Sequence, residues 1–499
     1  MIILTSIAGK DDWLAFSPDG FFDGTRAAWQ LVPFRFPSEP LRLYEPEQFF
    51  NQFYQPGLLA DIFREGKPIR EILEARNDPR ANLDISAYRN SKLPEVKIIN
   101  PEDGLKSGER AIRVTVEAKD TGSGIRDLRV FRNQTLVHFE HGDLKPDART
   151  GTYTLTASVK LVEGRNEISA YAFNRDNLKS KDVPIRVEGF RTLKRKGVAY
   201  VLAVGINGYS NPDWNLNFAV NDAEGISGRL DGSFKKLNTY AQTITVNLLN
   251  RDATKVNLLT AFSLLSGAIT SLPLGAPDEL KNLRRAEPED DIIVYFSGHG
   301  MAEQDRYYLI PHDMGYQGRK SELDKAGREI IMKHSLSDQD LNTGFEKIDA
   351  GRMMLIIDAC QSGQALESEE KRRGPMNSRG LAQLAYEKGM YILAAAQSHQ
   401  SALELEKLSH GILTYTLLEE GLKKLAADNS PKDNQITAEE WLDYATQHVG
   451  REVETAKTQY AKKKGGEQID GGEVTVTGQS PRAYYRRERV EDPWVVSRQ

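Results

Sequence analysis

Runs of consecutive apolar residues punctuate the second half of the chain and predict buried strands. These runs are 199–205, 292–296, 353–357 and 391–396, and residues 243–249 are a further strand candidate. Strands that are apolar on both faces are typical of parallel sheets covered by helices on both sides. Segments with helical spacing of apolar residues lie between and after them, at 217–231, 253–271, 336–347, 379–388, 411–426 and 437–462. This alternation predicts an α/β domain with a mostly parallel sheet over residues 195–462, with functional groups at the carboxyl ends of its strands.

Residues 95–190 follow a second pattern, in which short segments alternate apolar and polar positions. These segments are 96–99, 111–118, 128–131, 153–159, 166–173 and 183–187, mostly separated by turn residues. A period of two is typical of strands with one buried face, so we expect an all-β sandwich of the Ig-like kind. The Cys…Trp…Cys core of antibody domains is absent. We interpret the sandwich as a rigid spacer, and binding of a protein partner is the alternative.

The two ends of the chain are less regular. Within residues 1–90, turn signals around Pro18 and Gly24 predict β-hairpins, and apolar residues in 46–76 have the spacing of one or two amphipathic helices. The polar stretch 77–94 contains Pro79 and Pro94 and is expected to be a linker. Residues 463–499 are mostly polar and are expected to form a C-terminal tail.

Composition and net charge limit the kinds of binding partner that we expect for this protein. The 499 residues are 39% hydrophobic with a formal net charge of −5, which gives no electrostatic case for nucleic acid or an anionic membrane as a partner. No run approaches the ~20 apolar residues that span a bilayer, and the first residues lack the basic region of a signal peptide. We therefore expect a cytoplasmic protein. The single cysteine excludes an intrachain disulfide.

Reactive side chains follow two of the predicted buried strands. His299 comes directly after the run 292–296, and Cys360 comes after 353–357. Alone, a histidine here more often closes a turn and a lone cysteine is more often a core residue. If the two strands are neighbours, however, the imidazole and the thiol face each other, and a nearby imidazole raises the reactive thiolate fraction. The backbone amides of Gly300 and Cys360 would then form an oxyanion hole.

These motifs resemble those of the caspase-like cysteine peptidases, and among them the prokaryotic metacaspases and orthocaspases more than the animal caspases. The matching pieces span about residues 197–450 in the expected order: Gly205-Ile-Asn-Gly-Tyr, Asn221-Asp-Ala, Tyr295-Phe-Ser-Gly-His-Gly, Asp358-Ala-Cys-Gln-Ser-Gly and His410-Gly-Ile-Leu-Thr-Tyr-Thr-Leu-Leu. The resemblance implies a caspase-haemoglobinase fold, a catalytic Cys360–His299 dyad and peptide substrates. Residues 10–75 are similar to the segment that precedes the peptidase in bacterial WD40-containing relatives, which implies a shortened relative or a fragment.

The resemblance also implies a basic residue at the substrate position P1. Asp358 stands where animal caspases carry glutamine and metacaspases carry aspartate, and Asp222 and Ser297 match the other residues of the metacaspase S1 pocket. The physical chemistry agrees, because partly desolvated carboxylates favour a guanidinium or an ammonium group. The plainer alternatives are a surface helix residue for Asp222 and a residue that hydrogen-bonds its own turn for Asp358.

Two further expectations concern self-processing and metals. The charged loop after the cysteine offers cleavable bonds after Lys371, Arg372, Arg373 and Arg379, or it is an ordinary solvated loop. Many metacaspases need calcium, and Glu367 and Asp338 fall near acidic positions of that kind. Gln339 occupies what is usually a second acidic position, so we expect no metal cofactor. One cysteine and eight scattered histidines give no zinc spacing.

Other functions remain open to this sequence. A catalytically silent scaffold would keep the caspase-like domain for binding alone, although both residues of the dyad are present. A Cys–His hydrolase or transferase of another class would use the same thiolate on a non-peptide acyl group. The acidic S1 residues favour an endopeptidase that cleaves after Arg or Lys.

Overall fold

The computed structural model describes residues 3–6, 12–33, 35, 43–76, 78–303, 306–361, 379–397, 409–429, 431–463, 481–485 and 492–498. The chain divides into two compact units: Met1–Arg195 with Glu387–Gly389, and Lys196–Tyr386 with Met390–Gln499.

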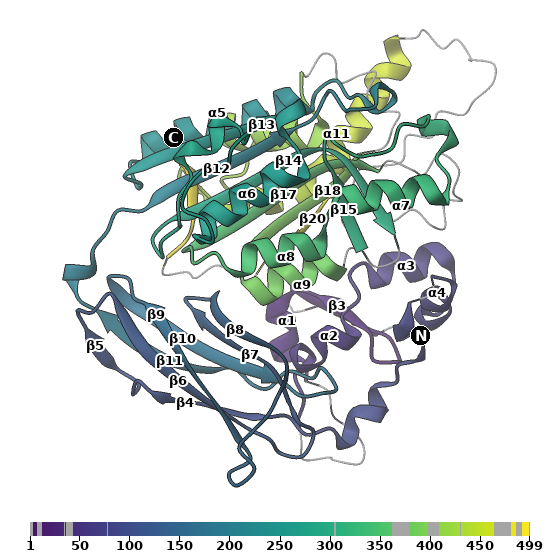
Figure 1. Ribbon diagram of the computed structural model, residues 1–499. Helices are drawn as coiled ribbons and strands as arrows, with labels where there is room; N and C mark the ends of the chain where they lie inside the picture. The colour runs from purple at the N-terminus through teal and green to yellow at the C-terminus, as the bar shows by residue number, and fades with distance from the viewer. Residues whose placement is uncertain are drawn as a thin grey trace. The chain divides into compact units, whose positions relative to one another are not determined.

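The second unit is built on an eight-stranded sheet (Figure 1). Its strands are β12 (Val198–Gly205), β13 (Gln242–Leu249), β14 (Asp291–Glu303), β15 (Arg306–Ile310), β16 (Leu336–Ser337), β17 (Arg352–Gln361), β18 (Tyr391–Gln397) and β20 (Arg482–Tyr484). The order β13-β12-β14-β17-β18 is parallel throughout, β20 adds an antiparallel edge, and β15 and β16 extend from β14. The parallel core agrees with the continuous apolar runs, since β12, β14 and β17 are buried on both faces, whereas β13 at the edge alternates buried and exposed residues.

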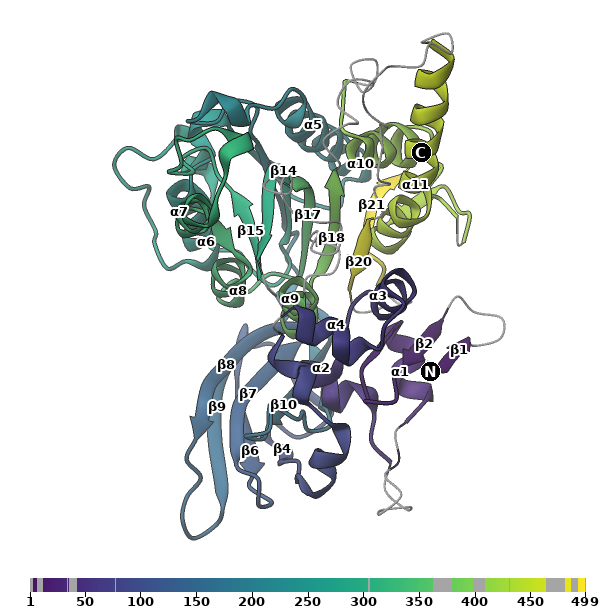
Figure 2. The same cartoon turned by 90° about the vertical axis from the view of Figure 1, so that its right-hand side faces the viewer.

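Helices cover both faces of this sheet. They are α5 (Ala219–Leu237), α6 (Lys255–Ser266), α7 (Lys325–His334), α8 (Asp338–Glu346), α9 (Arg379–Lys388), α10 (Ile412–Tyr415), its π-helical continuation Thr416–Lys423, and α11 (Ala438–Lys463). Figure 2 shows α5, α10 and α11 on one face and α6 and α8 on the other. The first face has a continuous apolar core that includes Ile226, Tyr295 and Trp441. No helix within the described ranges is both long and apolar enough to cross a membrane.

Part of the segment expected to be a tail belongs to the core of this unit. β20 pairs with β18, and β21 (Val495–Arg498) pairs with β19 (Gln435–Thr437). Trp494 and Val496 are fully buried. The segment is polar on average, but a few large apolar side chains suffice to bury it once a sheet edge is available to receive its backbone.

Residues 95–189 of the first unit form two packed sheets. Their strands are β4 (Glu95–Asn100), β5 (Leu105–Ser107), β6 (Ala111–Lys119), β7 (Ile125–Arg132), β8 (Thr135–Leu144), β9 (Thr152–Lys160), β10 (Gly164–Phe173) and β11 (Val183–Gly189). One sheet has the order β4-β6-β9 and the other β5-β11-β10-β7-β8. Buried residues alternate with exposed ones along β9 and β11, and they enclose the core between the sheets. The period-two segments predict no strand at β5 or β8, and in the structure neither strand has a regular alternation of buried and exposed residues.

The N-terminal part of the first unit combines a small sheet with short helices. Its elements are β1 (Ile3–Ser6), β2 (Trp13–Phe16), β3 (Phe22–Gly24), α1 (Arg26–Leu31), α2 (Phe50–Phe53), α3 (Leu58–Glu65) and α4 (Ile69–Ala75). Aromatic rings fill its centre: Trp29 packs edge-on against Phe22 and Tyr54, and Tyr54 stacks on Phe50.

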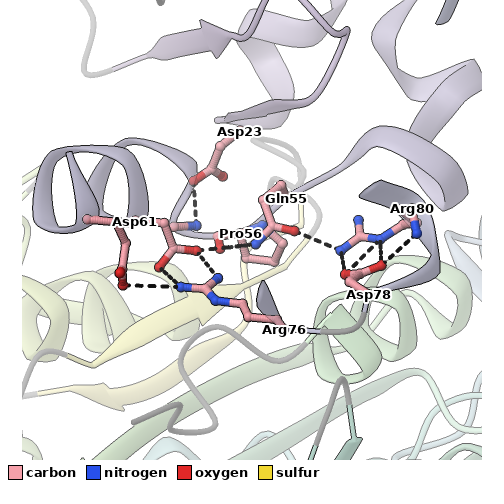
Figure 3. Close-up of polar contacts among 9 residues, drawn as sticks. Asp23, Gln55, Pro56, Asp61, Arg76, Asp78 and Arg80 are labelled. Atoms are coloured by element: carbon pink, nitrogen blue, oxygen red, sulfur yellow. Dashed lines mark hydrogen bonds and ion pairs between the residues drawn. The ribbon is translucent and has the colours of Figure 1, made fainter. Parts of the chain in front are cut away.

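The start of the expected linker is packed rather than free. Asp78 and Arg80 are both buried, and the Arg80 guanidinium contacts the Asp78 carboxylate at 2.7 Å and Gln55 Oε1 at 2.8 Å. Beside them, Arg76 makes two hydrogen bonds to Asp61, at 2.7 and 3.0 Å (Figure 3). Charged residues give a stretch the polarity of a linker in sequence, but opposite charges that pair in the fold satisfy one another.

Candidate active site

The register of two central strands brings the candidate dyad together. β14 and β17 run side by side in parallel, and the Cα partner of His299 is Cys360. Two residues earlier, Ser297 is the partner of Asp358. Both pairs lie at the carboxyl ends of their strands, where ligand sites form in open α/β sheets. Because side chains two apart in a strand share a face, Ser297 and His299 project to the same side of the sheet.

The sheet changes its pairing at this point. Up to Ser297, β14 pairs with β12, whose last residue is Gly205. From His299 onward, β14 pairs instead with β15 as an antiparallel hairpin. His299 is the first residue of β14 that pairs with β15.

The glycines on either side of His299 are required by close neighbours. A Cβ atom at Gly298 would lie 2.9 Å from the Tyr209 hydroxyl, and one at Gly300 would lie 1.8 Å from the Tyr307 hydroxyl. Any side chain at Gly300 would therefore displace Tyr307. The glycines of the Gly-His-Gly motif are thus explained by the close approach of the Tyr209 and Tyr307 hydroxyls.

His299 is held in one orientation. Its ring is fully buried between Tyr209 and Trp214, and its Nε2 lies 2.7 Å from the Trp214 carbonyl oxygen. A carbonyl only accepts hydrogen bonds, so Nε2 carries the proton. In the neutral ring Nδ1 is then the basic nitrogen. The backbone N–H of His299 also donates to the Tyr209 hydroxyl at 2.7 Å.

Asp222 and Ser297, which the sequence assigns to the S1 pocket, are in contact. Ser297 Oγ donates to Asp222 Oδ2 at 3.2 Å. The other carboxylate oxygen, Oδ1, accepts from the Gly411 backbone N–H and lies against His410 Nδ1, each at 3.0 Å. Burial raises the pKa of Asp222 above its ordinary value, and the bonds from His410, Gly411 and Ser297 oppose that shift.

Asp358, the third predicted S1 residue, lies beside the same cluster. Its Oδ2 accepts a hydrogen bond of 2.9 Å from Thr414 Oγ1, and Thr414 lies 2.5 Å from the Tyr295 hydroxyl. The pKa of Tyr295 is well above its ordinary value, first because the ring is buried and then because the charges of Asp222 and Asp358 are near. The fold therefore gathers all three predicted S1 residues around Tyr295, with Asp222, Ser297 and Asp358 almost fully buried.

Sequence reasoning missed several members of this site. His410, Gly411 and Thr414 belong to a motif that supported the family resemblance, but no role was assigned to them. His410 and Gly411 lie 188 and 189 positions from Asp222, and Thr414 lies 56 positions from Asp358, so only the motif itself signalled them. Trp214 acts through its backbone carbonyl, which no residue type encodes.

The remaining predicted residues are those proposed for self-processing and those near the acidic calcium positions of metacaspases. Lys371, Arg372, Arg373 and Glu367 lie outside the described residues, and of Arg379 the structure describes only the backbone, at the start of α9. Asp338 is buried and paired with Arg306 at 3.3 Å, and Gln339 accepts from the same guanidinium at 2.9 Å. Burial raises the pKa of Asp338, and Arg306 opposes this. Among the described residues, no group of three or more His, Cys, Asp and Glu side chains is placed to hold a metal ion.

Comparisons with known proteins place part of this unit in a family. The family model of the caspase domain of peptidase C14 matches residues 274–475. No curated protein matches the chain.

Solved structures match only distantly. They include fibronectin(III)-like modules of Clostridium thermocellum CbhA, with 20% identity over 19% of this chain and 97% of that chain at a TM-score of 0.16. An endo-β-1,4-mannanase from Thermotoga petrophila has 13% identity over 22% of this chain and 23% of that chain, with a TM-score of 0.16. A CARDB domain from Pyrococcus furiosus has 20% identity over 19% of this chain and 96% of that chain, with a TM-score of 0.15. Likenesses at these TM-scores carry no argument about function.

The matched range contains both strands on which the site is built. It begins before β14, which carries His299, and continues past β17, which ends with Cys360 and Gln361. It also includes the residues from His410 to Thr414 that contact the acidic cluster. The second unit therefore contains a region, residues 274–475, that matches the caspase domain of the peptidase C14 family.

Proposed function

We propose that this chain is a cysteine endopeptidase that cleaves after Arg or Lys, with Cys360 as nucleophile and His299 as its proton-transfer partner. The observation that carries the proposal is the register of β14 and β17, in which His299 and Cys360 are direct partners at the carboxyl ends of adjacent strands. The contact from Nε2 to the Trp214 carbonyl supports it, because that contact leaves Nδ1 as the basic nitrogen.

The reaction follows from these roles. The Cys360 thiol gives its proton to His299, and the thiolate attacks the scissile carbonyl to form a tetrahedral oxyanion. The backbone amides of Gly300 and Cys360 are assigned to that oxyanion, where one donor typically contributes ~10²–10³ in kcat. His299 then protonates the leaving amine, and water hydrolyses the acyl-enzyme with His299 as general base.

The basic P1 preference is proposed from the acidic cluster. Asp222, Ser297 and Asp358 supply buried oxygen atoms near one another on the face that His299 also occupies. A guanidinium or ammonium group gains charge-assisted hydrogen bonds in such a place, whereas an acidic P1 side chain would meet like charge.

One set of assays tests the proposal. Wild type and Cys360→Ala are compared on otherwise identical peptides with Arg, Lys or Asp at P1, with calcium and with a calcium chelator. We expect hydrolysis after Arg and Lys only, no need for calcium, and loss of activity by at least about 10⁴-fold in the Cys360→Ala protein. Preference for Asp at P1 would contradict the specificity, and equal activity of the two proteins would favour a silent scaffold.

Self-processing is part of the same proposal. A peptidase with this specificity has substrates in its own chain, at Lys371, Arg372, Arg373 and Arg379. We expect the intact mass of the wild-type protein to show cleavage after one of these residues, while the Cys360→Ala protein stays whole. Identical masses for both proteins would rule out self-processing and leave the peptidase assignment standing.

A further inference from the structure

His410 differs from the other residues that surround the S1 carboxylate. Its side chain is 18% exposed, whereas that of Asp222, which it contacts at 3.0 Å, is 2% exposed. Within the described residues, His410 is also the ion-pair partner of Asp222. An imidazole can be neutral or charged, whereas the other donors to Asp222 are the Ser297 hydroxyl and the Gly411 backbone amide.

The position of His410 is built by its neighbours. Gly225 of α5 leaves room for the ring, since a Cβ atom there would lie 2.9 Å from His410 Cε1. The next residue, Gly411, donates its backbone N–H to the same oxygen, Asp222 Oδ1, at 3.0 Å. His410 and Gly411 together therefore hold one oxygen of the carboxylate, while Oδ2 faces the Ser297 hydroxyl.

We propose that His410 is a positioning residue that sets the charge of the S1 pocket and thereby its affinity for a basic P1 side chain. This inference rests on the proposed function, because it takes Asp222 to be a residue that receives P1. When His410 is neutral, its Nδ1–H orients Asp222 and leaves the pair with one negative charge. When His410 is protonated, the imidazolium cancels that charge and competes with the incoming guanidinium or ammonium group.

The other groups of the cluster do not change the direction of this effect, which is weaker binding of a cation when His410 is protonated. On β14, Ser297 and Tyr295 present hydroxyls, and the pKa of Tyr295 lies well above its ordinary value, so it stays neutral where histidine titrates. On β17, Asp358 accepts a hydrogen bond from Thr414 and adds negative charge near Tyr295. Protonation of Asp222 itself would also weaken binding of a cation, so the experiment must separate Asp222 from His410.

The effect of His410 on peptide binding can be measured in a variant that cannot cleave the bound peptide. On the Cys360→Ala background, the dissociation constant of an Arg-P1 peptide is measured by calorimetry across the range in which histidine titrates, about pH 5 to 8. A citrulline-P1 peptide has nearly the same shape without the charge and serves as the control ligand. We expect the Arg-P1 peptide to bind roughly tenfold more weakly at the acidic end, and the citrulline-P1 peptide to show no such change.

Variants assign the change to His410. His410→Asn keeps a donor near the position of Nδ1 but does not titrate, so it should bind the Arg-P1 peptide equally at both ends of the range. His410→Lys, with a fixed positive charge, should bind it weakly throughout. The matched control is His448→Asn in α11, which removes another half-buried histidine, one that hydrogen-bonds the Tyr444 carbonyl at 2.9 Å, and should keep the pH dependence.

The outcomes separate the inference from the proposed function. If His410→Asn retains the pH dependence, or if the parent protein shows none while still preferring Arg over citrulline, the role of His410 is wrong and the S1 assignment stands. If the parent protein does not distinguish Arg from citrulline at any pH, the S1 assignment itself fails. Thermal unfolding of each variant shows whether a loss of binding reflects loss of the fold.

Discussion

The two ends of the β14–β17 pair hold a buried carboxylate in different ways. At the amino end, Asp291 accepts hydrogen bonds from the Arg352 guanidinium at 3.1–3.2 Å and from the Tyr240 hydroxyl at 2.5 Å. At the carboxyl end, Asp222 accepts from a serine hydroxyl and a backbone amide, and its ionic partner is the partly exposed His410.

The difference separates a carboxylate that serves stability from one suited to a ligand. An arginine is charged at every relevant pH, so Asp291 is permanently neutralised by its own chain. Asp222 has neutral donors and a titratable partner, so a cation from outside the chain still gains from binding there. Burial raises the pKa of both carboxyls, and therefore the kind of partner, not the degree of burial, distinguishes them.

The amino-end cluster also fastens the C-terminal segment. Trp494 Nε1 donates to the Tyr240 hydroxyl at 3.1 Å, and the Arg352 guanidinium lies 5.6 Å from the centre of the Trp494 ring. The same arginine thus neutralises Asp291 and covers a fully buried tryptophan. This explains how residues near the end of the chain become part of the core of the second unit.

The largest effect should come from removing the permanent cation. Arg352→Met leaves Asp291 buried without its charge partner, and we expect the free energy of unfolding to fall by about 3 kcal/mol. That value is at the low end for a buried pair because 32% of the Arg352 side chain is exposed. Denaturant unfolding measures the loss, and kcat/KM of the folded protein should not change.

The control for Arg352→Met is Lys235→Met in α5, whose partner Asp231 lies at 2.6 Å but whose own side chain is 69% exposed. An exposed pair of this kind contributes roughly 0.5 kcal/mol or less. Equal destabilisation by the two substitutions would remove the distinction between a stabilising and a ligand-binding end.

The next effect should appear at the carboxyl end, in activity. Asp222→Asn keeps the size of the side chain but removes the charge and replaces one acceptor oxygen with an NH2 donor. We expect kcat/KM on an Arg-P1 peptide to fall roughly 30-fold, about 2 kcal/mol, mainly through KM. A fall confined to kcat, or the same fall on a citrulline-P1 peptide, would show that Asp222 does not act on the P1 charge.

The same variant makes a prediction about pH and stability. The pKa of Asp222 is raised in the folded protein, so between the unfolded and folded pKa values the native state binds more protons than the unfolded state. The contribution of Asp222 to stability is therefore largest below the unfolded pKa and falls as pH rises through this interval. Asp222→Asn should lack that fall when unfolding is measured from acidic to neutral pH.

The smallest effect tests how the C-terminal segment is held. Tyr240→Phe removes the hydroxyl that joins Trp494 to Asp291, and we expect a loss of about 1 kcal/mol in unfolding free energy with unchanged catalysis. Tyr316→Phe is the control, since its hydroxyl makes one exposed contact of 3.4 Å with the Arg319 carbonyl. A loss of stability equal to that of the control would show that the hydroxyl does not hold the segment.

The parallel core of the second unit was predictable because its signal is local. The run 199–205 corresponds to β12 (Val198–Gly205) and 391–396 to β18 (Tyr391–Gln397), since strands buried on both faces need uninterrupted apolar residues. β20 and β21 gave no such signal, because edge strands are short and keep polar residues.

The amino-acid sequence alone determined which reactive groups the chain carries and that His299 and Cys360 each follow a buried strand, because apolar runs and their ends are local properties. The tertiary structure alone decided that these strands are neighbours in a register that makes the two residues partners. It likewise decided that the Trp214 carbonyl orients the histidine and that His410 meets Asp222. These relations join backbone atoms or distant parts of the chain, and no local pattern of side chains specifies them.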